Sequence, residues 1–279
     1  MSIFSGLESF GLGKLKNVTI YEKQEKNDKQ TDEEKKEQPK ITEADILFDK
    51  TYTCPVCDSE FKAKTVRTGK IKLMSADTDL RPKYQLVDAL KYDAIVCPRC
   101  GYAALNRFFT YMTSGQSKLI RENISVNFQG IEDNGEVYTY DDALARHKLA
   151  LLNTIVKKGK TSERAYTCLK LAWIFRGKAE NLPEDTENRE TVLLELKKEE
   201  DELIKNAYEG FSQAFAKEQF PLCGMDESTA TYLVADLARK SGCYDESKRW
   251  ISRILTSRTA NERIKAKARE LKNMIKDNE

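Results

Sequence analysis

The sequence predicts an α+β fold that is mostly helical, with a small β-rich module on the N-terminal side and an array of paired helices behind it. Two observations lead to this prediction. Four cysteines form two Cys-x-x-Cys pairs, Cys54 with Cys57 and Cys97 with Cys100. From Thr139 onward, apolar residues recur at spacings of three and four, which is the period of an amphipathic helix. The two parts of the chain therefore differ in secondary structure.

Length and composition limit the possible classes of protein. The 279 residues suggest two domains of ordinary size. Lysine and arginine total 47 against 45 acidic residues, so the chain lacks the basic excess of a general polyanion binder. It also lacks the roughly 20 consecutive apolar residues of a membrane span. The first residues do not resemble a secretory signal, and seven cysteines, an odd number, suit a reducing compartment, so we expect a cytoplasmic protein.

Residues 1–46 are expected to form a disordered, charged N-terminal tether. A short apolar patch at residues 3–15 is followed by YEKQEKNDKQTDEEKKEQPK, which has almost nothing to bury and cannot offset its ordering entropy. The patch itself is either a frayed end or a short helix that docks on a partner or on the protein's own body.

Residues 47–112 are expected to form the β-rich module. Residues 51–53, 60–66 and 92–96 have the β-branched and aromatic content of short strands. Gly101 and Asp58, each one residue beyond a cysteine pair, tolerate a positive φ that turns the backbone toward the sulfurs. The stretch from Gly69 to Lys91 is polar and irregular, and Ala103 to Met112 has the spacing of a short helix. Residues 113–138 are expected to be a connector.

The four cysteines predict a structural zinc site with one Zn²⁺ per chain. Each Cys-x-x-Cys turn brings two sulfurs to one side of a tight loop, and two turns complete the tetrahedron that Zn²⁺ prefers. A redox pair would need one Cys-x-x-Cys at the start of a helix, and a catalytic zinc would keep one position open for water. Cys54, Cys57, Cys97 and Cys100 therefore predict a closed site in a zinc ribbon.

Residues 139–279 are expected to form a helical-repeat domain. Thr139 can cap the first helix, Pro183 interrupts the pattern, and a last helix runs from about Asn261 to Lys276. The small–aromatic–small spacing of Ala207, Phe211 and Ala214 resembles the second helix of a tetratricopeptide repeat (TPR). A fuller but degenerate unit follows, with Gly242 at its turn. Stacked units of this kind present an extended concave surface.

A set of basic residues between the cysteine pairs suggests nucleic-acid binding as an alternative. Aromatic residues lie among them, a mixture that can hold phosphates and stack bases. The opposing interpretation is a solvated ribbon face, because acidic residues lie nearby. The candidate contacts are Arg67, Lys70, Lys72, Arg81 and Lys83.

Catalytic signatures are weak. His147 is the only histidine and lies between Leu144 and Leu151, which favours a core position, so Ser–His or Cys–His catalysis lacks support. Cys223, in a loop between helices, is the free thiol that a thiol enzyme would use, although a packing role is favoured over a catalytic one.

Several segments resemble a bacterial family known as domain of unknown function 2225. They are FDKTYTCPVCDSEFKAKTVRTGK, DTDLRPKY, YDAIVCPRCGYAA, PLCGMDESTATYLVADLARKSG and WISRILTSRTANERIKAKARELK. The resemblance covers nearly everything after the tether. It implies that Cys54, Cys57, Cys97 and Cys100 are the paired ligands, followed by helical repeats in a bacterial cytoplasmic protein, and it implies no activity.

We therefore expect a non-enzymatic zinc-binding adaptor or scaffold whose helical repeats bind a protein partner. A nucleic-acid-associated regulator that uses the basic ribbon is the alternative. A zinc- or thiol-dependent enzyme is the third hypothesis.

Overall fold

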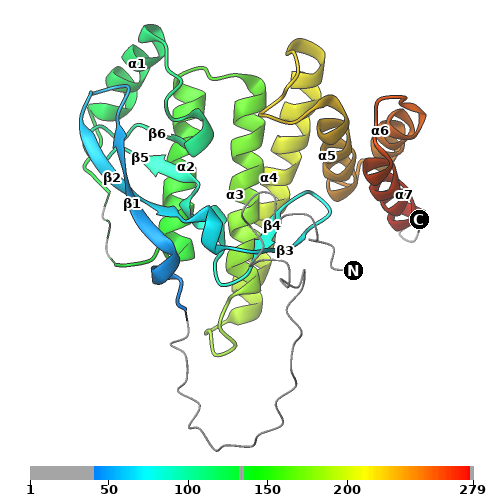
Figure 1. Cartoon of the computed structure of the whole chain (residues 1–279), viewed down its shortest axis with the longest axis horizontal. Coiled ribbons are helices and arrows are strands. Elements are labelled where there is room, and N and C mark those ends of the chain that lie inside the picture. The colour runs from blue at the N-terminus through cyan, green and yellow to red at the C-terminus, as the bar shows by residue number, and fades with distance from the viewer. Residues whose placement is uncertain (1–40, 132, 134, 277–279) are drawn as a thin grey trace, which may run out of the picture. The chain divides into compact units, whose positions relative to one another are not determined.

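The computed structural model describes residues 41–131, 133 and 135–276. The tether expected at residues 1–46 lies outside this range except for residues 41–46, of which Ala44–Ile46 form a 3₁₀ helix, η3, with Ile46 buried. The described residues fall within one compact unit. They are mostly helical and contain three small antiparallel strand pairs (Figure 1).

Two β-hairpins carry the cysteines. Strands β1 (Leu47–Thr53) and β2 (Glu60–Val66) pair from Leu47 opposite Val66 to Thr53 opposite Glu60. Strands β5 (Ala94–Val96) and β6 (Ala103–Leu105) pair with Val96 opposite Ala103. In each hairpin the Cys-x-x-Cys segment forms the turn that connects the two strands.

The two turns repeat one backbone pattern. The N–H of Cys54 donates to the carbonyl of Ser59 at 3.0 Å, and the N–H of Cys97 donates to that of Tyr102 at 2.8 Å. The positive φ expected beyond each pair is confirmed, at 58° for Asp58 and 71° for Gly101.

The helix expected at Ala103 to Met112 is wrong. The chain instead forms β6 and then a 3₁₀ turn, η6 (Asn106–Phe108). The second hairpin needs a return strand, and Ala103–Leu105 supplies it with buried side chains on the ladder with β5. A helical spacing of apolar residues therefore arose from a strand that is buried on both faces.

The segment after η6 packs on the cysteine hairpins. Helix α1 (Ser114–Ile120) begins with a capping box in which Thr113 and Gln116 exchange hydrogen bonds, and a π-helical turn, η7 (Arg121–Ser125), continues it. Ile120 and Ile124 join the apolar cluster that contains Cys54 and Cys97. The connector boundaries expected at residues 112 and 138 stay a prediction.

Six further helices follow in chain order. They are α2 (Tyr140–Val156), α3 (Thr161–Glu180), α4 (Arg189–Lys217), α5 (Glu227–Lys240), α6 (Tyr244–Thr256) and α7 (Glu262–Lys276). Each packs mainly against its neighbour in sequence, and α2 also covers β5 and β6 (Figure 1). The expected start of α2 is confirmed, because the Thr139 hydroxyl accepts the N–H of Asp142. The break before Pro183 and the last helix are also confirmed.

The polar stretch between the hairpins has its own structure. A 3₁₀ helix, η4 (Thr68–Lys70), leads to a small hairpin of β3 (Leu73–Ala76) and β4 (Pro82–Tyr84), and η5 (Ala89–Tyr92) leads to β5. In Figure 1 this hairpin crosses in front of α3 and α4.

The tip between β3 and β4, residues 77–81, is anchored on the helices. Arg176 of α3 donates to both carboxylate oxygens of Asp79, at 3.1 and 2.6 Å, and Asp79 is fully buried. Tyr232 of α5 donates to the carbonyl of Thr78 at 2.9 Å. Leu80, at a φ of 68°, packs against both apolar clusters of the helical part. The tip therefore covers part of the helical surface.

Candidate metal centre

The two hairpin turns bring the four cysteine sulfurs together. The Sγ atoms of Cys54 and Cys100 are 3.5 Å apart, those of Cys57 and Cys97 are 3.7 Å apart, and all four lie within 4.8 Å of one another. A tetrahedral ion with bonds of about 2.3 Å requires sulfurs separated by about 3.8 Å. Four sulfurs at this spacing can therefore enclose one metal ion.

The cluster is largely shielded from water. Cys54, Cys97 and Cys100 are buried, and Cys57 is partly exposed. The rings of Tyr52, Phe61, Tyr102 and Phe109 pack around the cluster or against each other. An apolar surrounding of this kind limits solvent access to a bound ion.

The thiols perturb one another strongly. Hydrogen bonds with Cys100 and Cys54 hold the pKa of Cys97 far below its usual range, whereas hydrogen bonds with Cys54 and Cys97 raise the pKa of Cys100. Crowded like charges cannot all form without compensation. A divalent cation supplies that compensation and permits four thiolates at once.

Ser59 is a polar neighbour that our sequence analysis missed. Its hydroxyl oxygen lies 2.9 Å from the Sγ of Cys57 and 3.6 Å from that of Cys97. The N–H of Val56 also points to the Sγ of Cys54 at 3.4 Å. The position of Ser59, two residues beyond a ligand, is the one signal that sequence inspection offers for such a group.

Distant residues support the two turns through their backbone carbonyls. Arg121 of η7 donates from Nε to the carbonyl of Val56 at 2.8 Å, and its second nitrogen contacts the same oxygen. Ser125 donates to the carbonyl of Cys100 at 2.8 Å, and Asn153 of α2 donates to that of Gly101 at 3.1 Å. These three residues were not predicted from the sequence, because no local motif links them to the cysteines.

A bacterial protein family, described as an uncharacterized protein conserved in bacteria (DUF2225), matches residues 47–275. The chain belongs to this family. The match begins at the first residue of β1 and includes all four cysteines, and it confirms the resemblance drawn from the motif segments. Comparison with curated proteins and with solved structures finds no match.

The two candidate catalytic residues, His147 and Cys223, do not belong to the cysteine cluster. His147 is completely buried in α2, where its Nδ1–H donates to the carbonyl of Ala143 at 2.8 Å, and desolvation lowers its pKa. The thiol of Cys223 donates to the carbonyl of Ser162 at 3.2 Å, and burial raises its pKa to about 12. Cys223 holds little thiolate at neutral pH and is therefore not an activated nucleophile. His147 has no exposed surface through which it could reach a substrate.

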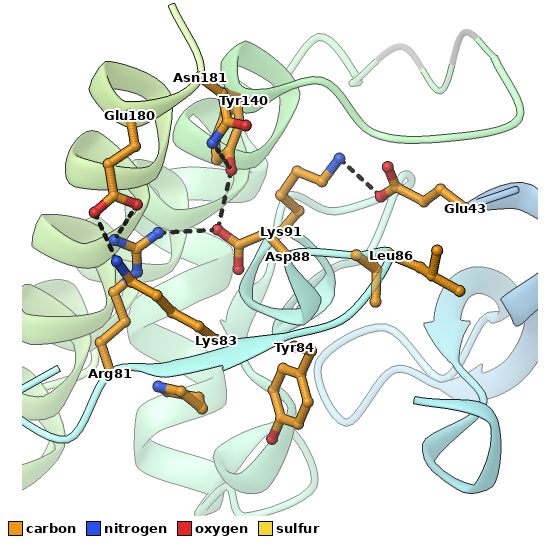
Figure 2. Close-up of a pocket in the computed structure, with 12 residues that line it drawn as sticks. Glu43, Arg81, Lys83, Tyr84, Leu86, Asp88, Lys91, Tyr140, Glu180 and Asn181 are labelled. Carbon is orange, nitrogen blue, oxygen red and sulfur yellow. Dashed lines mark hydrogen bonds and ion pairs between the residues drawn. The ribbon is translucent and has the colours of Figure 1, made fainter. Parts of the chain in front are cut away.

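The structure separates the five basic candidates into two groups. Arg67, Lys70 and Lys72 are exposed around the end of β2 and η4. Arg81 is buried, and its guanidinium lies 2.9 Å from Glu180 and 3.4 Å from Asp88 (Figure 2).

Lys83 completes the second group. It pairs with Glu180 at 3.0 Å and with Asp77 at 3.2 Å. Arg81 and Lys83 are therefore neutralised by carboxylates of the protein itself. Nucleic-acid contact through the five residues stays a prediction, and only the exposed three are available to phosphate without breaking ion pairs.

Within the described part of the chain, no helix combines the length and the apolar character that a bilayer crossing requires.

Proposed function

We propose that Cys54, Cys57, Cys97 and Cys100 hold one structural Zn²⁺ ion and that the protein is a non-enzymatic scaffold. The observation that supports this most directly is the set of four sulfurs within 4.8 Å, two from each hairpin turn. Four thiolates form a closed tetrahedral shell, which is the arrangement of structural rather than catalytic zinc sites.

The role of the ion is to connect the two hairpins. They are separate two-stranded sheets, and a two-stranded hairpin alone is marginally stable in water. An ion bound by both turns links the hairpins at their tips, so that its binding free energy becomes folding free energy for the module.

The helical part supplies the proposed partner surface. Ala207, Phe211 and Ala214 are fully buried, as their positions in a TPR-like second helix require. Ser247 and Ile254, at the corresponding positions of the next unit, are also buried. Packing of each helix on its sequence neighbour suits a degenerate helical-repeat array. The first half of α4 leaves Leu194 72% exposed among charged residues of the same helix face, which gives a protein partner an apolar contact with a polar rim.

The zinc proposal is tested by elemental analysis of the purified protein. We expect about one zinc per chain in the wild type, loss of zinc in Cys97→Ser, and full retention in Cys243→Ser, which replaces an exposed cysteine outside the cluster. Wild-type protein that is folded, reduced and free of metal would contradict the proposal, and stoichiometric iron in place of zinc would change the metal.

The scaffold proposal is tested by site-specific crosslinking in the host. A photoreactive residue at Leu194 should capture one discrete protein, with or without nuclease, whereas the same residue at the exposed Arg249 of α6 should not. Capture that disappears with nuclease treatment would favour the nucleic-acid alternative, and equal capture at both positions would oppose a specific surface on α4.

A further inference from the structure

A cavity of about 640 Å³ lies between the cysteine module and the helices. One wall comes from residues 107–116, which follow β6 and begin α1. The other comes from residues 160–163 at the start of α3 and residues 218–224 between α4 and α5. Cavities of 300 to 1,000 Å³ are typical of sites for small organic ligands, so its size suits such a ligand.

Much of the lining is apolar and aromatic. Phe108, Tyr111, Met112 and Pro221 contribute to it, and Tyr111 is 74% exposed at the rim. Cys223 also lines the cavity, but its thiol is bonded to a carbonyl and its pKa is about 12, so it acts as an apolar wall rather than a nucleophile. A ligand that fills this space therefore gains from burying an apolar body.

The two carboxylates of the lining are already satisfied by the protein. Glu163 pairs with Lys157 at 2.7 Å. Glu218 accepts the N–H of Ser162 at 3.0 Å and its hydroxyl at 2.5 Å. Lys157 neutralises Glu163, whereas both oxygens of Glu218 are occupied by the backbone and hydroxyl donors of Ser162, so neither carboxylate forms an ion pair with Arg107.

Arg107, which also lines the cavity, makes no ion pair with any residue that the structure describes. Its guanidinium lies over the rings of Tyr166 and Phe108, 5.2 and 5.7 Å from their centres. It also abuts Gly224, where a β-carbon would collide with one terminal nitrogen. The positive charge of Arg107 contributes to lowering the pKa of Asp93, but the ion-pair partner of Asp93 is Lys170, at 3.0 Å.

These contacts hold the guanidinium in place without neutralising it. Contacts with two aromatic faces and a glycine turn place this exposed side chain beside the cavity and restrict its rotamers, which lowers the side-chain entropy lost when it binds an anion. A planar guanidinium matches the two oxygens of a carboxylate, and such charge-assisted pairs are among the stronger hydrogen bonds in proteins.

We propose that this cavity binds a small organic carboxylate with an apolar body, such as a medium-chain fatty acid or an arylalkanoic acid. The carboxylate lies on Arg107, and the apolar body lies along Phe108, Tyr111 and Met112. This ligand site is separate from the metal centre and goes beyond the proposed scaffold function.

Calorimetric titration of the zinc-loaded, full-length protein with decanoate and 4-phenylbutyrate tests the proposal. At least one of the two should bind with one site per chain. Decanol, which lacks the charge, and acetate, which lacks the apolar body, should each bind at least ten times more weakly. Arg107→Met should weaken binding by a factor of ten or more. Arg164→Met, which removes an exposed arginine of α3 outside the cavity lining, should leave it unchanged.

Tyr111→Ala provides a second test if Arg107→Met unfolds by circular dichroism. Its ring is mostly exposed, so the fold should persist while the affinity falls about threefold to tenfold. The proposal is overturned if neither acid binds at millimolar concentration, if decanol binds as tightly as decanoate, or if the folded Arg107→Met or Tyr111→Ala variant binds like the wild type.

Discussion

Asp79 is a carboxylate without exposed surface at the tip between β3 and β4. Burial raises its pKa, but the bidentate contact with Arg176 and the charge of Lys240 at 3.7 Å outweigh that effect, so its pKa lies below the usual range. Asp79 is therefore ionised, and it shares Arg176 with two further carboxylates, Asp77 at 2.9 Å and Glu200 at 2.7 Å.

We expect Asp79→Asn to lower the free energy of unfolding by about 1–3 kcal/mol, because it removes a buried charged acceptor while Asp77 at 2.9 Å and Glu200 at 2.7 Å still neutralise Arg176. Denaturant titration measures the loss. Asp141→Asn is the matched control, since Asp141 forms an exposed pair with Lys178 and its loss should cost about 1 kcal/mol or less. Equal losses in the two variants would show that the tip is not an electrostatic anchor.

His147 should make stability depend on pH in a window of its own. Desolvation lowers its pKa below 6.5 in the folded protein, with Asp93 and Asp88 opposing that shift and Lys170 adding to it. The unfolded chain therefore binds the proton more tightly, so this stability is complete above about pH 6.5 and falls as the pH drops toward the folded pKa.

The slope should not exceed about 1.4 kcal/mol per pH unit, and His147→Asn should remove it. Because His147 is the only histidine, few other groups change protonation between pH 5 and 6.5. Denaturant titrations of both proteins at pH 5.0, 5.75 and 6.5 measure the effect. A wild-type stability that is flat across this range would contradict a buried neutral imidazole.

At the scale of elements, α1 and η7 pack against the first cysteine turn and hydrogen-bond to its backbone. Arg121 donates twice to the carbonyl of Val56, which lies between Cys54 and Cys57. Removing an outer support of a metal ligand typically costs tenfold to a hundredfold in metal affinity. We therefore expect Arg121→Met to release zinc to a chelator at least ten times faster than the wild type.

A colorimetric zinc indicator follows that release. Lys118→Met is the control on the same segment, since Lys118 is exposed and pairs only loosely with Glu122 at 3.7 Å. If both variants release zinc like the wild type, the Arg121 contact does not support the metal site.

The elements that could be predicted are those with local signals. The two Cys-x-x-Cys motifs located the turns, and Thr139 with Asp142 marked the start of α2, because capping depends on neighbouring residues alone. The return strand at Ala103–Leu105 was missed because a short apolar run fits a strand and a helix equally well. Arg121, Ser125 and Arg107 were missed because their roles depend on tertiary contacts, which no spacing in the sequence records.

At the scale of the whole molecule, the cysteine cluster and the helices meet through α2. Ala150 of α2 packs against buried residues of β5 and β6, and Asn153 links α2 to the second cysteine turn. Helices α5 to α7 share a second apolar cluster, which Leu80 of the tip also contacts, and α5 contributes Leu233 and Leu237 to the cluster of α2 to α4. Loss of the metal should therefore spread from the hairpins to α2 and fade toward the C-terminal helices.

Hydrogen exchange with and without a zinc chelator tests this gradient. We expect faster exchange in β1, β2, β5, β6, η7 and the C-terminal half of α2, where hydrogen bonds depend on the two turns. Helices α5 to α7 should keep their protection, because Ile251, Leu271 and Ile275 are buried in a cluster that contains none of the four cysteines. Equal loss of protection in α5 to α7 would mean that the cysteine cluster and all helices unfold as one cooperative unit, connected by the packing of α5 on α4 and by the tip at residues 77–81.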